Sequence, residues 1–149
     1  MKESGLPRLP CLCASLRRAT RALTQHYDEA LRPLGLRVTQ FTVLQALSLT
    51  GEVSQRKLGD ILALDSTTLT RTLDIMRRSG WISRRRGADR REWRLQLSRS
   101  GEDQLKGALP SWKKTQMQIA SQLDDKRWYE LFELTDQITT LVANPGDLT

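Results

Sequence analysis

The sequence has few of the residues that cross-link a fold or hold a metal, and it has no long apolar run. It contains two cysteines and one histidine among 149 residues. The cysteines lie two positions apart, too close to join distant parts of the chain, so a disulfide framework is excluded. No apolar run approaches the ~18 residues that span a bilayer, and no charged region followed by a long apolar stretch opens the chain. We therefore expect a cytoplasmic protein without membrane contact.

Catalytic motifs are also missing. The sequence has no glycine-rich loop for phosphates, no metalloprotease helix and no histidine near either cysteine. A metal site at Cys11 and Cys13 would need further ligands, and His26 lies about three to four helical turns away. The sequence therefore predicts no enzyme, no cofactor and no metal, and His26 is expected on a helix surface or in a dimer interface.

Positive charge is abundant and unevenly distributed. The formal net charge is +7 and the isoelectric point about 10.0, which favours a polyanionic partner. Residues 77–94 hold eight arginines against Asp89 and Glu92, a local balance of +6. From residue 122 onward, six acids outweigh two bases. Double-stranded DNA is therefore the expected partner of the arginine-rich segment, while the acidic tail is not expected to touch it.

The spacing of apolar residues predicts a mainly α-helical chain with helices at both ends. Apolar side chains three or four positions apart indicate long helices within residues 8–34 and 98–144, with a kink or a break at Pro110. These segments carry wider apolar stripes than one small module can cover. We therefore expect an N- and C-terminal helical dimerisation region, which makes the protein a homodimer.

Residues 36–97 between these segments are predicted to form a winged helix-turn-helix module. Thr39 and Ser54 are expected to cap two short helices, and Asp65 a third helix that Gly80 ends. After Gly80 the pattern changes to two short strands joined by a loop. A small basic β-hairpin directly after a helix-turn-helix is a wing.

The helix that begins near Asp65 presents a polar face opposite its apolar face. Short hydroxyl side chains allow a helix to approach DNA closely, and an arginine can match O6 and N7 of guanine. The alternative is a solvated face, because Ser and Thr are common near helix starts. The expected DNA contacts of this recognition helix are Ser66, Thr67, Thr68, Thr70, Arg71 and Arg77.

Arginines are concentrated in the hairpin. The alternative to a DNA contact is again a solvated charged surface. Like charges around one hairpin repel each other and gain energy by neutralising phosphates or entering a narrow minor groove. Asp89 is expected to orient the guanidinium of Arg91 through a charge-assisted hydrogen bond. The expected DNA contacts of the wing are Arg85, Arg86, Asp89, Arg90 and Arg91.

These segments resemble the MarR family, the multiple antibiotic resistance regulators. The wing motif of that family is an aspartate, any residue and an arginine, with a later Leu-Ser or Leu-Thr that leads to a glycine. It stands here as residues 89–91 followed by residues 97–101. Residues 64–71 look like the family's recognition helix, and the resemblance extends over residues 13–141. It implies an obligate dimer on a palindromic operator with half-sites about 10 bp apart, with Arg91 in a minor groove.

Cys13 is a candidate redox sensor, together with Cys11 and Tyr27. Its place near a helix start, with basic residues one turn later, favours a reactive thiolate. The resemblance implies a hydroperoxide sensor whose cysteine hydrogen-bonds tyrosines of the other subunit. Tyr27 matches one such tyrosine, about 21 Å along the helix at ~1.5 Å per residue, whereas Val38 stands where the second would be. A buried cysteine acting as a small apolar residue is the alternative.

Three functions are weighed from this sequence. It favours a sequence-specific transcriptional regulator, a repressor released by a small ligand or by thiol oxidation. A non-specific architectural nucleic-acid binder fits the charge but not the hydroxyl-bearing helix face. An enzyme with a redox thiol lacks every catalytic motif sought. The resemblance implies small aromatic acids as effectors, and no residue marks a pocket for one.

Overall fold

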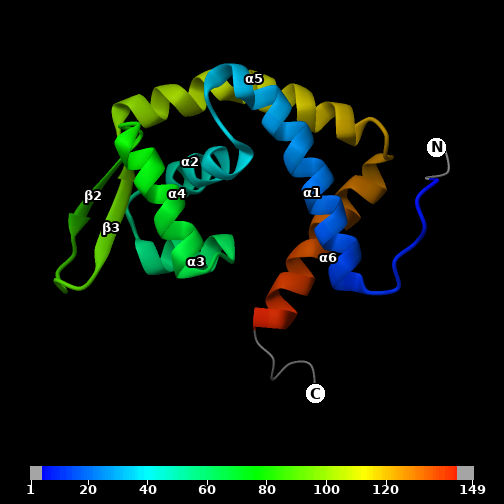
Figure 1. The fold of residues 1–149 in the computed structure, drawn as a ribbon, viewed down its shortest axis with the longest axis horizontal. Coiled ribbons are helices and arrows are strands. Elements are labelled where there is room, and N and C mark those ends of the chain that lie inside the picture. The colour runs from blue at the N-terminus through cyan, green and yellow to red at the C-terminus, as the bar shows by residue number, and fades with distance from the viewer. Residues whose placement is uncertain (1–4, 144–149) are drawn as a thin grey trace. The chain divides into compact units, whose positions relative to one another are not determined.

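The computed structural model describes residues 5–143 (Figure 1). They fall into two compact units: residues 8–112, and a smaller unit of which residues 5–7 and 113–143 are described. The boundary between the units falls within helix α5 (Arg99–Ala120).

The larger unit is mainly helical with one small antiparallel sheet, which confirms the predicted fold class. Three strands form this sheet in the order β1-β3-β2, so β3 pairs with both neighbours. The elements before α5 are α1 (Leu12–Leu31), η1 (Arg32–Leu34), α2 (Val38–Thr50), β1 (Val53–Ser54), α3 (Gln55–Leu62), α4 (Ser66–Arg78), β2 (Ile82–Arg86) and β3 (Trp93–Leu97).

The start of α2 differs from the prediction. The helix begins at Val38, so Thr39 lies inside its first turn and is not the cap. Instead, Oδ1 of Asp28 on α1 accepts the N–H of Val38 at 2.7 Å. Gln40 also accepts the N–H of Arg37 through its side-chain oxygen at 3.0 Å. The acceptor for the free N–H comes from ten residues upstream, which local spacing does not reveal.

The core of this unit lies where α2, α3 and α4 meet the sheet. Phe41, Leu44, Leu58, Leu69 and Met76 are buried from these three helices. A fully buried side chain of this size contributes roughly 1.5–3 kcal/mol relative to an exposed one. The apolar side predicted for α4 is therefore confirmed, and its opposite side is left for solvent.

The junction between the hairpin and α5 is packed closely. Ser98 caps α5, because its Oγ accepts the N–H of Gly101 at 3.0 Å. The same hydroxyl donates to the carbonyl of Gly80, which ends the turn after α4 in a left-handed conformation (φ 76°). A Cβ atom on Gly101 would collide with the carbonyl of Trp81. This close approach of two backbones explains the glycine of the wing motif.

The predicted break at Pro110 is absent, because α5 continues as one helix through this residue. Proline has no N–H to bond the carbonyl of Lys106, and its ring crowds that carbonyl, so a kink at Pro110 stays a prediction. Both residues are exposed, so water can reach this side of the helix.

The smaller unit contains the end of α5 and helix α6 (Asp125–Ala143). Asp124 caps α6, since its Oδ1 accepts the N–H of Arg127 at 2.8 Å. The predicted segment 98–144 ends one residue outside the described part. No described residue of α6 is buried within the chain. Its exposed large apolar side chains are Tyr129, Leu131, Phe132, Leu134, Leu141 and Val142.

Among the helices of residues 5–143, none combines the length and the apolar character needed to cross a membrane.

Candidate nucleic-acid interface

The first turn of α4 is held by its own cap. Asp65 is the N-cap, as predicted: one carboxylate oxygen accepts the N–H of Thr68 at 2.9 Å and the other accepts its hydroxyl at 2.6 Å. These hydrogen bonds, that from the hydroxyl first, hold the pKa of the Asp65 carboxyl below its usual value. The first turn of α4 therefore keeps its shape although both residues are exposed.

The outer face of α4 carries short hydroxyls and one guanidinium. Ser66, Thr67 and Arg71 are exposed: Thr67 and Arg71 lie on the side of the helix opposite the buried Leu69 and Leu73, and Ser66 lies in the first turn at the edge of the buried side. Within residues 5–143, no hydrogen bond or ion pair engages the side chain of Arg71. The predicted recognition face is thus brought to a single solvent-facing surface, with a free guanidinium that can form two parallel hydrogen bonds.

Three other predicted contacts of α4 are engaged inside the unit. The Thr68 hydroxyl belongs to the cap. The Thr70 hydroxyl accepts from Nε2 of Gln55 at 3.1 Å, which ties the recognition helix to the start of α3. Arg77 lies 3.7 Å from Asp74 in an exposed pair, which leaves its guanidinium accessible. Sequence reasoning missed Gln55, because it lies 15 positions from its partner.

The hairpin has two chemically different faces. The register pairs Arg85 with Arg94 and Arg86 with Trp93. Because successive side chains of a strand alternate between the faces of a sheet, Arg84, Arg86 and Trp93 share one face. Arg85 and Arg94 share the other, directly opposite each other.

On the first face, Trp93 holds two arginines. The guanidinium carbons of Arg84 and Arg86 lie 4.1 Å and 3.7 Å from the centre of its ring. Each contact is worth about 0.5–1 kcal/mol at an exposed site. Nη1 of Arg86 also donates to the carbonyl of Arg90 at 2.7 Å. Sequence reasoning gave Trp93 no functional role. The alternation of side chains along the two strands nevertheless places its ring on the same face as Arg84 and Arg86.

On the second face, Glu52 binds both opposed arginines. Its two carboxylate oxygens accept from Nη2 and Nε of Arg85 at 2.6 and 2.9 Å, and one also accepts from Nε of Arg94 at 2.8 Å. Arg94 donates further to Glu92 at 2.9 Å. The hydrogen bonds from Arg85 and then Arg94 hold the pKa of Glu52 below its usual value, and those to Glu52 and then Glu92 raise the pKa of Arg94. Sequence reasoning missed this cluster, which joins residues 33 and 42 positions apart.

The wing tip corrects the prediction for Asp89. Its Oδ1 accepts the backbone N–H of Arg91 at 2.9 Å and not the guanidinium. An aspartate reaches the N–H two residues on because its side chain is short, which is the geometry of an Asx turn. The side chains of Arg90 and Arg91 are exposed, and no ion pair holds them within the described residues.

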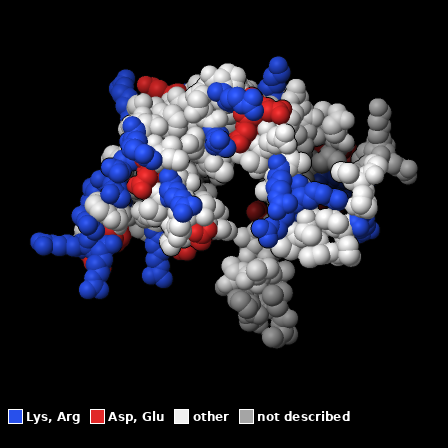
Figure 2. All heavy atoms as spheres, viewed as in Figure 1, with Lys and Arg blue, Asp and Glu red and all other residues white. Residues whose placement is uncertain are grey.

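Positive charge gathers over the hairpin. Figure 2 shows lysines and arginines crowded at the end of the larger unit where β2 and β3 project. The exposed start of α4 belongs to the same compact unit, so both predicted DNA elements are carried by one body. This arrangement can place a polar helix and a cationic hairpin against one polyanion.

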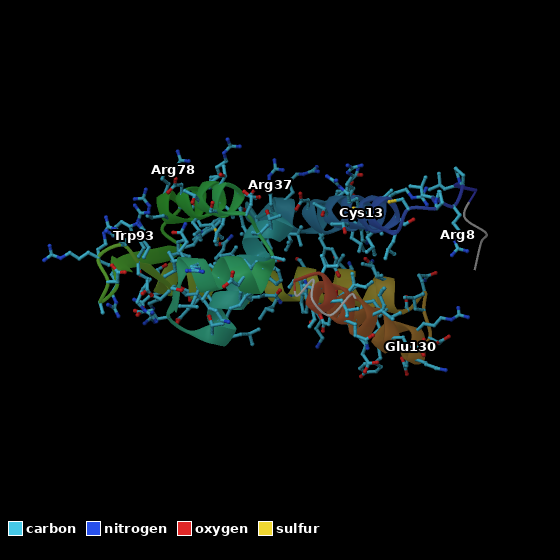
Figure 3. The ribbon with its side chains drawn as sticks, turned by 90° about the horizontal axis from the view of Figure 1, so that it is seen from below. Arg8, Cys13, Arg37, Arg78, Trp93 and Glu130 are labelled. Carbon is cyan, nitrogen blue, oxygen red and sulfur yellow. The ribbon has the colours of Figure 1, made fainter. Side chains whose placement is uncertain are left out.

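The cysteines lie away from this surface. Figure 3 shows Cys13 near the start of α1, far from Trp93 of the hairpin. Both cysteines are exposed free thiols, so a buried apolar role within the chain is wrong for Cys13. His26 is exposed, as expected. Tyr27 is partly buried, and this burial raises its pKa. Among the described residues, no group of three or more His, Cys, Asp or Glu side chains could hold a metal ion.

Comparison with known proteins identifies the family. A sequence profile described as MarR family matches residues 36–93. YwoH of Bacillus subtilis strain 168, an uncharacterized HTH-type transcriptional regulator, is 31% identical over 91 residues, which cover 61% of this chain and 66% of YwoH. The alignment therefore spans slightly less than two thirds of that relative.

Solved structures extend the likeness over most of the chain. The transcriptional regulator MosR of M. tuberculosis, solved in complex with DNA, has a TM-score of 0.81 and 35% identity, covering 89% of this chain and 96% of MosR. A mutant of E. coli MarR solved with operator DNA is similar in fold, with a TM-score of 0.77 at 21% identity over 85% of this chain and 92% of that one. The profile, these likenesses and the winged helix-turn-helix above show that this chain belongs to the MarR family of DNA-binding transcriptional regulators, which are not enzymes.

Proposed function

We propose that this protein is a sequence-specific repressor that binds a palindromic double-stranded operator as a homodimer. The observation that carries the proposal is the exposed face of Ser66, Thr67 and Arg71 in the same unit as a hairpin tipped by two free arginines. Base edges are read by that face in the major groove, and Arg91 enters the flanking minor groove. The complex of MosR with DNA supports duplex DNA as the ligand.

The other predicted residues take supporting roles in this proposal. Thr68 and Asp89 position the helix start and the wing tip through the hydrogen bonds they make. Thr70, Arg77 and Arg90 contact the sugar–phosphate backbone, which positions the protein without reading sequence. Arg86 stays on Trp93 beside the duplex.

The wing is tested by measuring operator affinity against salt. The operator is selected from genomic DNA by binding, and affinity is followed by fluorescence anisotropy with unrelated duplex as competitor. Arg91→Ala should weaken binding and flatten the dependence of log affinity on log salt, because the homodimer loses one cationic contact in each subunit. Arg21→Ala, which removes an exposed arginine of α1, is the matched control. An unchanged slope for Arg91→Ala removes the wing from the interface, and equal affinity for unrelated duplex favours an architectural binder.

The homodimer is supported by the unburied apolar side of α6. Leu134 is 55% exposed and Phe132 47% exposed, although large apolar side chains of a finished core are seldom this accessible. Sedimentation velocity should therefore find a dimer at micromolar concentration. Leu134→Glu should shift it to monomer and weaken operator binding, while the exposed control Glu133→Gln leaves both unchanged. A monomeric parent protein contradicts the proposal.

Release by thiol oxidation is supported by the exposure of both thiols. The thiolate of Cys13 attacks the O–O bond of an organic hydroperoxide, which yields a sulfenic acid and, after protonation, the alcohol. Mild cumene hydroperoxide should then release operator from the parent but not from Cys13→Ser. Tyr27 of the partner would take the hydrogen bond of the sulfenic acid, and Cys11→Ser reports the share of the second thiol. Equal release from parent and Cys13→Ser retires this mechanism.

The structure of the larger unit supports release by a small aromatic acid less well than release by thiol oxidation. A groove of about 540 Å³ lies between the end of α2, β3 and α5. It is lined by Glu52, Glu102 and one cation, Lys106, beside several leucines. Two carboxylates oppose an anionic ligand, so release by salicylate at millimolar concentration is not expected.

A further inference from the structure

The arginines of the hairpin are not equally available. Arg90 and Arg91 at the tip are exposed and unpaired within the described residues. Arg85 and Arg94 share the carboxylate of Glu52, although the side chain of Arg85 is still 62% exposed. Exposure alone would therefore count Arg85 as a DNA contact, whereas the Nε and Nη2 donors that would grip a phosphate in a paired bond are already engaged by Glu52.

The register explains why a carboxylate stands there. Arg85 and Arg94 are direct cross-strand partners, and like charges directly opposite each other destabilise a sheet. Glu52 accepts two bonds from Arg85 and one from Arg94, so it offsets the repulsion of the pair. A phosphate that bound either guanidinium through the same donors would have to displace this carboxylate.

The position of Glu52 also joins the hairpin to the helix-turn-helix. Glu52 directly precedes β1, which pairs with β3, and Ser54 at the end of β1 caps α3 through the N–H of Lys57 at 3.1 Å. A side chain at this point contacts both strands of the hairpin and belongs to the segment that enters α3. It therefore fixes the hairpin relative to the helices that carry the recognition face.

We propose that Glu52 is a positioning residue for DNA binding, which withholds Arg85 and Arg94 from phosphates and so determines which wing arginines contact the duplex. This inference rests on the proposed function. The carboxylate acts as an internal competitor of the phosphate backbone, and it lowers binding to unrelated DNA more than binding to the operator. Glu52 thus favours specificity at the expense of affinity.

The first test is Glu52→Gln, which removes the charge and keeps the shape. Affinity for unrelated duplex should rise several-fold at low salt, and the salt slope of the homodimer should steepen by up to about 3.6, at roughly 0.9 for each of the two phosphates gained per subunit. The ratio of operator affinity to non-specific affinity should fall. Glu29→Gln removes one exposed acid of α1 as the matched control and should leave the slope unchanged. An unchanged slope for Glu52→Gln overturns the inference.

The second test separates this inference from the proposed function. Arg85→Gln with Arg94→Gln in the parent should leave the salt slope nearly unchanged, because these arginines are withheld. Arg90→Gln with Arg91→Gln should flatten the slope of the homodimer by up to about 3.6, because two arginines are lost from each subunit. If both pairs flatten it equally, the role of Glu52 is wrong while the wing remains a DNA contact. If the tip pair has no effect, the proposed wing contact itself fails.

The third test asks whether Glu52 acts through the two arginines or only repels DNA. In the triple variant Glu52→Gln, Arg85→Gln and Arg94→Gln, the slope and the specificity ratio should return to the parental values. Persistence of the Glu52→Gln gain in the triple variant overturns the inference in favour of simple repulsion. Thermal melting of each variant checks that it folds. If Glu52→Gln does not fold, the salt slope of the variant with Arg85→Gln and Arg94→Gln still tests the inference.

Discussion

The outer face of α4 and the β2–β3 hairpin are both exposed and polar, yet they are built in opposite ways. The helix face uses short side chains that are fixed at one end by the cap at Asp65, and it leaves Arg71 free. The hairpin uses long side chains, and Trp93 and Glu52 hold four of its arginines. The difference teaches that the number of charges on a surface overstates the number available to a ligand.

The largest expected effect comes from disrupting the packing between the base of the hairpin and the start of α5. Gly101→Ala should destabilise the protein by about 1–3 kcal/mol, because its Cβ collides with the backbone carbonyl of Trp81, which cannot move away as a side chain would. Urea denaturation followed by circular dichroism measures the change. Gly107→Ala is the control, since open space surrounds that position on α5 and alanine favours a helix by about 0.5–1 kcal/mol. Equal stability of Gly101→Ala and the parent would contradict the packing described.

Arg71→Ala tests whether the helix face reads sequence. Loss of its bidentate contact should remove about 1–3 kcal/mol of discrimination at one base position per half-site. Competition binding over a set of single-base operator variants measures this loss. The tip variant Arg91→Ala should weaken all operator variants alike, which distinguishes reading from anchoring. An unaltered profile for Arg71→Ala, or a loss confined to one base position for Arg91→Ala, would refute the assignment of roles.

The cap at Asp65 makes the stability of the α4 helix face depend on pH, unlike that of the hairpin. Its pKa is lowered on folding, so the cap stabilises the protein above the ordinary pKa of 3.8 and loses this effect as the pH falls through the lowered value. Asp65→Ala should lower Tm by about 2–4 °C at pH 7, and the difference from the parent should shrink in acid. Asp65→Asn keeps an acceptor for the Thr68 N–H without titrating, so its melting should lack this pH dependence. A difference between parent and Asp65→Ala that is constant with pH would contradict the cap geometry.

The most local expected effect concerns Trp93. Trp93→Leu removes the ring under Arg84 and Arg86 and should cost about 0.5–1 kcal/mol for each contact, felt in the hairpin alone. Hydrogen exchange of the β2 and β3 amides should become faster, while exchange in α4 is unchanged. Trp93→Phe retains an aromatic face and should show an intermediate effect. Exchange as slow as in the parent for Trp93→Leu would mean that strand pairing alone orders the hairpin.

The parts of this structure that could be predicted from sequence are those with short-range causes. The caps at Ser54, Asp65 and Ser98 each bond an N–H three residues on, so the chemistry and the spacing are visible together. The alternation of strand residues and the apolar faces of the helices are equally local. The recognition face followed from these elements.

The parts that could not be predicted depend on pairs brought together by the fold. Asp28 replaces the expected cap at Thr39 from ten residues away, and the bonds of Glu52 to the hairpin span 33 and 42 positions. Asp89 was assigned to the wrong group of Arg91, because spacing alone does not distinguish a backbone N–H from a guanidinium. In each case one partner of the bond was visible in the sequence and the other was not.

The carboxylate of Asp28 has a mechanical consequence. It lies on α1 and accepts the free N–H of Val38 at the start of α2, so it links the two helices beside the connection through η1. Any movement of α1 that lengthens this 2.7 Å bond leaves the Val38 N–H without its acceptor. Both free thiols lie at the other end of the same helix, so α1 connects them to the start of α2.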